Sequence, residues 1–89
     1  MWGWLLAGLI IGAAIVIVVS YLDKSVAKQK AHAEVPDAVK LKVKSIAKDG
    51  STTRVKMSAL DEYDNNINDI EFEADEVSSD IYQGQQIYI

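Results

Sequence analysis

The chain opens with an unbroken apolar stretch, residues 2–22, that contains no charged side chain. A helix of about twenty residues is about 30 Å long, which matches the hydrocarbon core of a bilayer. Trp2, Trp4 and Tyr21 stand at the two ends of the stretch, and aromatic rings favour the membrane interface. The pattern therefore predicts a single transmembrane helix. The alternatives are a buried core helix and a signal peptide cleaved near residues 31–33.

A helical pattern continues beyond this stretch, because residues 23–35 are rich in Ala, Lys and Gln and contain neither Gly nor Pro. The transmembrane helix is expected to run on to about Ala33 and to end before Pro36. Lys24 and Lys28 share a face at helical spacing and are expected at the membrane interface, in contact with anionic lipid or with solvent alone.

Small residues mark one side of the apolar stretch, where Gly8 and Gly12 form a GxxxG pattern. Such glycines let a second helix approach closely, so they are candidate helix-packing residues; the alternative is that the lipid simply tolerates small side chains there. Basic residues follow the stretch but do not precede it. The bias of Lys and Arg toward the cytoplasm predicts a single-pass protein of a cell inner membrane, with the N-terminus outside and the C-terminal domain in the cytoplasm.

From residue 39 onward the hydrophobic period changes from helical to two, which indicates strands with one buried face. A hairpin is predicted around a two-residue turn at Asp49-Gly50, with Ile46 opposite Thr53. This register needs one extra residue at Lys44-Ser45, a β-bulge, to keep the apolar side chains of both strands on one face.

A second hairpin is predicted with a loop at residues 64–66, in which Asn66 is left-handed, and further strands are expected through Ile70 and Phe72 and over residues 85–89. The predicted core consists of Val39, Leu41, Val43, Ile46, Val55, Met57, Leu60, Ile70, Phe72, Val77, Ile81, Ile87 and Ile89.

The expected fold class is therefore a transmembrane helix that continues into a juxtamembrane helix, followed by a small all-β domain. That domain has four or five short strands in an OB-like or SH3-like curled sheet or barrel. The expected divisions are a transmembrane helix over residues 1–22, a juxtamembrane stalk and linker over 23–38, and the β-domain over 39–89.

Composition narrows the range of functions. The net charge is −4, with nine basic and thirteen acidic residues, which does not suit a general nucleic-acid binder. The absence of cysteine excludes disulfides and thiolate metal sites, and the single histidine excludes multi-histidine sites. No nucleotide-binding loop and no nucleophile–base pair occurs in the sequence. Neither an enzyme nor a bound cofactor or small-molecule substrate is expected.

The charges are segregated along the chain. Residues 39–58 hold six basic residues and one acid, and residues 59–80 hold nine acids and no base. Lys42 is expected opposite Lys56, with acidic side chains of a neighbouring strand on the same outer face. Either these charges neutralise one another across strands, or they form a two-sided surface for protein or anionic lipid. The candidate interaction face comprises Lys40, Lys42, Lys56, Glu71 and Glu73.

The acidic half also contains a partial match to a calcium loop. Asp64, Asn66 and Asn68 fit its first ligand positions and Asp75 its twelfth, but Asp69 occupies the position that calls for Gly. The segment is interpreted as a turn, with a cation site as the alternative.

These patterns together predict a non-enzymatic membrane accessory or assembly subunit. Its helix would pack on partner transmembrane helices, and its β-domain would make protein contacts. The expected partners are the lipid bilayer and either another membrane protein or copies of the same chain, without nucleic acid. The alternatives are a homo-oligomeric module that organises or permeabilises the bilayer and a membrane-tethered sensor of a ligand or lipid.

Overall fold

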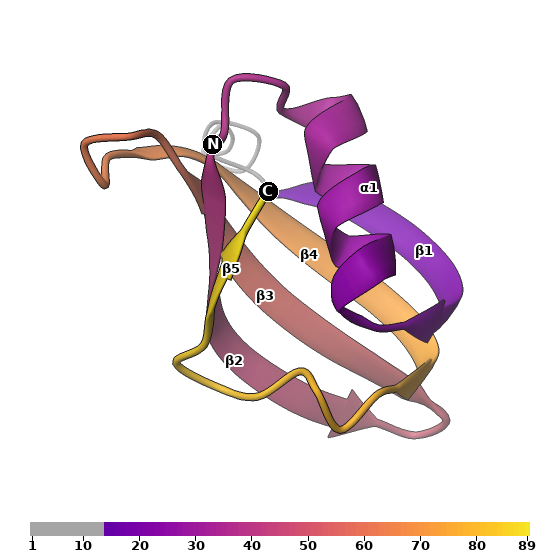
Figure 1. The fold of residues 1–89 in the computed structure, drawn as a ribbon. Coiled ribbons are helices and arrows are strands. Elements are labelled where there is room, and N and C mark those ends of the chain that lie inside the picture. Colours follow the sequence, from indigo (N-terminus) through magenta and orange to yellow (C-terminus); the bar gives the residue numbers. More distant parts are fainter. Residues whose placement is uncertain (1–13) are drawn as a thin grey trace, which may run out of the picture.

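The computed structural model describes residues 14–89. Its elements are β1 (Ile15–Leu22), α1 (Lys24–Glu34), β2 (Lys40–Asp49), β3 (Thr52–Leu60), β4 (Asn66–Val77) and β5 (Gln86–Tyr88). The strands form one five-stranded sheet in the order β1-β4-β3-β2-β5. β1 runs parallel to β4, whereas the other neighbouring pairs are antiparallel. α1 lies across one face of this sheet (Figure 1).

This architecture is a small mixed α/β domain, so the predicted fold class is wrong. The end of the apolar stretch, Ile15–Leu22, is a strand and not part of a transmembrane helix. A continuous apolar run is typical of a membrane helix but also of a buried parallel strand. Here the β-branched Val and Ile side chains favour the strand, and β4 supplies a pairing partner along its length. Within residues 14–89, no helix combines the length and the apolar character needed to cross a bilayer.

The OB-like or SH3-like barrel is also not observed. β1 and β5 are the two edges of an open sheet, and no pairing joins them among the described residues. β1 pairs only with β4 and β5 pairs only with β2 among the described strands, so each edge strand has one neighbour and the sheet stays open.

The helix predicted before Pro36 is present, but it starts afresh instead of continuing an earlier helix. The side chain of Asp23 accepts a hydrogen bond from the backbone N–H of Val26 at 2.9 Å, which caps the first turn of α1. Val35 forms the C-terminal cap directly before Pro36. The chain therefore reverses between β1 and α1 and returns over the sheet.

The predicted bulge in β2 is confirmed, since the pairing with β3 shifts between Val43 and Ser45. The predicted turn lies one residue too early. Gly50 takes the positive φ of 66° that this turn requires, so Asp49 remains in β2 opposite Thr52. Ile46 consequently lies opposite Val55 and not opposite Thr53.

The second hairpin has a longer loop than predicted. Leu60 pairs with Asn66, so residues 61–65 form the connection. Asp64, with a φ of 65°, takes the left-handed conformation that was expected for Asn66.

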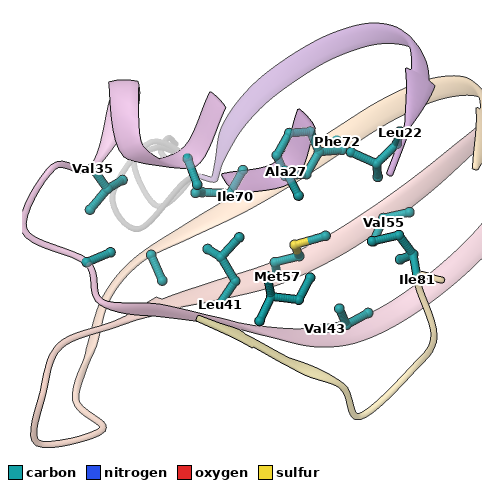
Figure 2. Close-up of a cluster of buried hydrophobic side chains, with 14 of the residues drawn as sticks. Leu22, Ala27, Val35, Leu41, Val43, Val55, Met57, Ile70, Phe72 and Ile81 are labelled. Atoms are coloured by element: carbon teal, nitrogen blue, oxygen red, sulfur yellow. The ribbon is translucent and has the colours of Figure 1, made fainter. Parts of the chain in front are cut away.

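The core lies between the sheet and α1 (Figure 2). Phe72 of β4 is fully buried at its centre, and Ala27 and Ala31 of α1 are fully buried above the sheet. Five buried residues come from the segment that was predicted to lie outside the β-domain, namely Leu22, Ala27, Ala31, Val35 and Ala38. Buried members of the predicted core are Leu41, Val43, Val55, Met57, Leu60, Ile70, Phe72, Ile81 and Ile87.

The other four predicted core residues are less buried. Val39 precedes β2 and is exposed, so its assignment to the core is wrong. Ile46, Val77 and Ile89 are only partly buried and pack against the margin of the core.

Candidate functional site

β1 has a free outer edge. It lies at the end of the strand order, and among the residues that the structure describes it pairs with β4 on its inner side alone. Ile15, Ile17 and Val19 pack against the core, whereas Val16 and Val18 on the opposite face are 54% and 74% exposed. Backbone N–H and C=O groups along such an edge are available to another strand.

Within residues 14–89, the edge also lacks the features that usually block strand addition. β1 is eight residues long and contains neither a charged residue nor proline. Natural proteins protect long edge strands with lysine, proline, bulges or a covering segment. The other edge, β5, is only three residues long. Among the described strands, β1 is therefore the long edge open to a partner strand.

The side of the sheet that α1 does not cover is termed the open face. Its side chains include Val16, Val18, Arg54, Lys56, Glu71 and Glu73. Within the sheet, Val16 lies opposite Glu71 and Val18 opposite Glu73. On the other side of β4, Lys56 lies opposite Glu71 and Arg54 opposite Glu73. The open face thus changes from apolar on β1 to acidic on β4 and basic on β3.

Part of this charge is neutralised within the face. The Nε atom of Arg54 lies 3.9 Å from Glu73, and its Nη2 atom lies 3.8 Å from Asp49. Lys42 lies opposite Ser58, so the expected juxtaposition of Lys42 with Lys56 does not occur. The cause is the turn at Gly50, which displaces the register of the whole hairpin.

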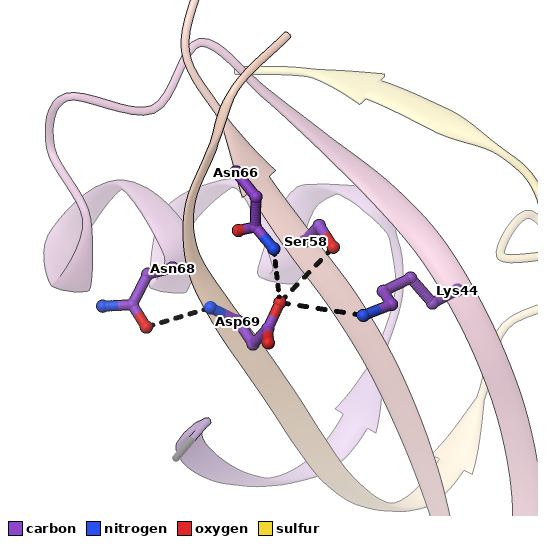
Figure 3. Close-up of polar contacts among 5 residues, drawn as sticks. All are labelled: Lys44, Ser58, Asn66, Asn68 and Asp69. Carbon is purple, nitrogen blue, oxygen red and sulfur yellow. Dashed lines mark hydrogen bonds and ion pairs between the residues drawn. The ribbon is translucent and has the colours of Figure 1, made fainter. Parts of the chain in front are cut away.

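A polar cluster forms around Asp69 near the start of β4 (Figure 3). Its Oδ1 atom accepts hydrogen bonds from Asn66 Nδ2 at 2.9 Å and from Ser58 Oγ at 3.4 Å, and it lies 3.8 Å from Lys44 Nζ. Lys44 is the extra residue of the β2 bulge, so the bulge brings its side chain toward β4. The Ser58 hydroxyl donates to a carboxylate that already has other donors, which is an arrangement of a structural cluster and not of an activated nucleophile.

A hollow of about 220 Å³ lies beside this cluster, between the start of β1 and the open face. Lys44 and Lys56 line it together with Asp69 and Glu71, and Ala14 closes one side. Bases and acids are equal in number there, so the hollow does not select an ion of either sign.

The loop between β3 and β4 uses its polar groups internally. Asp61 Oδ1 accepts hydrogen bonds from the backbone N–H groups of Asn65, at 2.9 Å, and Tyr63, at 2.8 Å. The bond from Asn65 is the main cause that lowers the pKa of Asp61, assisted by the one from Tyr63 and opposed by desolvation. The loop therefore has the hydrogen bonding of a turn.

Asp64 of the same loop forms an ion pair with Lys40. This hydrogen-bonded partner raises the pKa of Lys40, whose ammonium also lies 5.7 Å from the ring centre of Tyr88. Asp64, the first position of the calcium-like segment, is thus paired with the ammonium group of Lys40. Within residues 14–89, no three acidic or histidine side chains gather into a group that would hold a metal ion.

The predicted interface residues fall in different places. Tyr21 is exposed near the end of β1, and Lys24 and Lys28 are exposed on α1. Lys28 lines a hollow of about 460 Å³ between α1 and β5, together with Ser25, Gln29, His32, Tyr88 and Ile89. The remaining predicted membrane and helix-packing residues, Trp2, Trp4, Gly8 and Gly12, lie outside the described residues.

The predicted interaction face is divided by the fold. Lys56, Glu71 and Glu73 meet on the open face of the central strands. Lys40 is engaged with Asp64, and Lys42 lies on β2 opposite Gln86 as well as Ser58. Sequence reasoning missed β1 and its edge, although the five consecutive β-branched residues at positions 15–19 were an available signal for a strand.

Comparisons of the chain with protein-family models, curated proteins and solved structures gave no match. Function is therefore inferred from the geometry of the described residues.

Proposed function

We propose that this protein is a non-enzymatic interaction module that binds an extended protein segment along the free edge of β1. The observation that carries the proposal is the neutral, unpaired edge of an eight-residue strand with Val16 and Val18 exposed beside it. Strand addition uses such an edge for backbone hydrogen bonds and the alternate side chains for specificity.

The rest of the surface supports this assignment. The basic side chains on β3 lie opposite the acidic side chains on β4. The hydroxyl and amide donors of the polar cluster bind the carboxylate of Asp69. Exposed apolar side chains next to unpaired backbone are the remaining attractive feature on this side of the sheet. The proposal retains the accessory or assembly function expected from the sequence, with a strand edge as the binding element. The inner-membrane location stays a prediction.

A peptide titration tests the proposal. The probe is a fluorescently labelled peptide with the sequence of residues 15–22, flanked by lysines for solubility, and the full chain is titrated against it by fluorescence anisotropy. We expect saturable binding, because the probe offers both backbone donors and apolar side chains to the edge.

The control is the same peptide methylated at every backbone nitrogen, which keeps the side chains and removes the donors. Its affinity should be weaker by at least about tenfold, the cost of losing one or two net hydrogen bonds. The titration is made at chain concentrations at which the chain is monomeric by sedimentation. Equal binding of both peptides would show that apolar contact alone attracts the probe, and no binding of either to the monomeric chain would show a closed edge. Both results contradict the proposal.

A further inference from the structure

The free edge of β1 is complementary to itself. Ile15–Leu22 contains no charged residue, so two copies of the strand bring no like charges into direct contact. Val16 and Val18 are exposed apolar side chains on one face, and Ile17 and Val19 on the other face lie at the margin of the core. A second β1 would supply apolar neighbours to both faces at once.

From this geometry we infer that the partner segment is β1 of a second copy of the chain, paired antiparallel about a two-fold axis at Val18. The inference rests on the proposed function of the β1 edge. A two-fold axis pairs the edge with itself and closes the assembly, whereas parallel pairing of the two copies would leave an open, head-to-tail contact.

The alternation of side chains fixes which registers are possible. Opposed residues must belong to the same face of the sheet, so even positions pair with even positions and odd with odd. With the axis at Val18, Val18 meets Val18 of the other copy, and Ile17 meets Val19. On the open face, Val16 meets Ser20. This register places the most exposed apolar side chain of β1 against its own equivalent and extends the core across the axis.

Electrostatic repulsion does not oppose this assembly. The nearest acidic row on each copy is Glu71 and Glu73 of β4, one strand inward from the edge. In the paired assembly the two rows are three strand spacings apart, or about 14 Å. That separation exceeds the Debye length of about 8 Å at physiological salt. Glu73 also has Arg54 at 3.9 Å on the same copy.

Single-cysteine variants of the full chain test the register, because the natural chain has no cysteine. Val18→Cys should form an intermolecular disulfide on mild oxidation, since residues directly opposed across antiparallel strands have Cβ atoms about 5 Å apart. Val16→Cys and Ser20→Cys should cross-link poorly alone but efficiently with each other when the two variants are mixed. Tyr63→Cys is the control for chance collision, because Tyr63 is 76% exposed on a distant loop. The products are measured on non-reducing gels and by mass spectrometry.

Sedimentation equilibrium tests the interface independently of oxidation. The wild-type chain should have twice the mass of 9.8 kDa calculated for one chain. Val18→Lys places two ammonium groups at the axis and should raise the dissociation constant of the dimer by about tenfold or more. Val18→Thr keeps the branched shape and should remain dimeric, as should Tyr63→Lys. Far-UV circular dichroism establishes that each variant is folded.

The outcomes separate this inference from the proposed function. A dissociation constant of the dimer that is unchanged in Val18→Lys, or Val18→Cys cross-linking no better than Tyr63→Cys, overturns the pairing about Val18. A monomeric wild-type chain that still binds the residue 15–22 peptide through its backbone overturns the dimer but leaves the binding edge. A monomeric chain that binds no peptide overturns both.

Discussion

Single carboxylates organise the polar parts of this domain. Asp61 binds two backbone N–H groups and the side-chain amide of Asn65, and so holds together the loop between β3 and β4. Asp69 accepts hydrogen bonds from the side chains of Asn66 and Ser58 near the start of β4. Both carboxylates accept their hydrogen bonds from neutral donors.

The Asp61 interactions predict a specific response to acid. The lowered pKa of Asp61 means that its charged form is favoured by folding. Its contribution to stability is complete above the ordinary carboxyl pKa of about 4 and is lost as the pH falls through the lower, folded-state value. Carbon-13 NMR of the Asp61 carboxyl should give a midpoint below that ordinary value. Asp61→Asn should lower the melting temperature at neutral pH more than in acid. A midpoint at or above the ordinary value would contradict the interpretation.

At the scale of elements, the approach of α1 to the sheet depends on small side chains. Ala27 and Ala31 are one helical turn apart on the same face, and both are fully buried. Neither leaves space for a longer side chain without displacement of the helix. Asp23 fixes where this helix starts, so the turn after β1 determines which residues face the core.

Enlarging that contact should destabilise the domain. Ala27→Leu is expected to lower the free energy of unfolding by about 1–3 kcal/mol through overpacking. Ala33→Leu is the matched control, since Ala33 is exposed on the same helix and the two residue types have similar helix propensity. Urea denaturation of both variants measures the difference. Equal stability of the two variants would mean that α1 does not pack closely through Ala27.

The elements formed by local signals were the predictable ones. Alternation identified the β2–β3 hairpin and its bulge, and Pro36 marked the end of α1. The neutralisation of Arg54 by Glu73 follows from the same alternation once the strands are paired. The register was displaced because it depends on a single backbone angle, that of Gly50.

The identity of β1 and its free edge were not predictable in the same way. An apolar run contains no polar residues at regular intervals. It therefore has no hydrophobic periodicity that would distinguish a helix from a strand. Its partner β4 lies far along the sequence, and parallel pairing leaves no turn between the two strands as a signal. The candidate site was missed because it consists of unpaired backbone, which no residue type marks.

For the whole molecule, the open face forms parallel bands that run with the strands. The apolar band is at the β1 edge, the acidic band on β4 and the basic band on β3. Joining two copies at β1 places the apolar bands together at the centre of a continuous sheet. The charged bands then lie symmetrically on either side, where they favour solubility and oppose stacking of further sheets.

This assembly predicts that thermal stability depends on protein concentration. Because dimerisation stabilises the folded state by mass action, the melting temperature of the wild-type chain should rise by a few degrees per tenfold increase in concentration. The Val18→Lys variant should have a lower melting temperature at each concentration at which the wild-type chain is dimeric. Differential scanning calorimetry over a hundredfold range of concentration measures the effect. A wild-type melting temperature independent of concentration would contradict a dimer coupled to folding.

The parallel pairing of β1 with β4 also has a kinetic consequence. β2, β3 and β4 form a meander of local contacts, whereas Ile15 must find Ile70 across most of the chain. Loop-closure entropy delays such distant pairing, so the meander is expected to form before β1 docks. In that interval the vacant side of β4 is exposed to any β1, including that of another chain. Exchange of β1 between chains during refolding would then compete with correct docking, and increasingly so at high concentration.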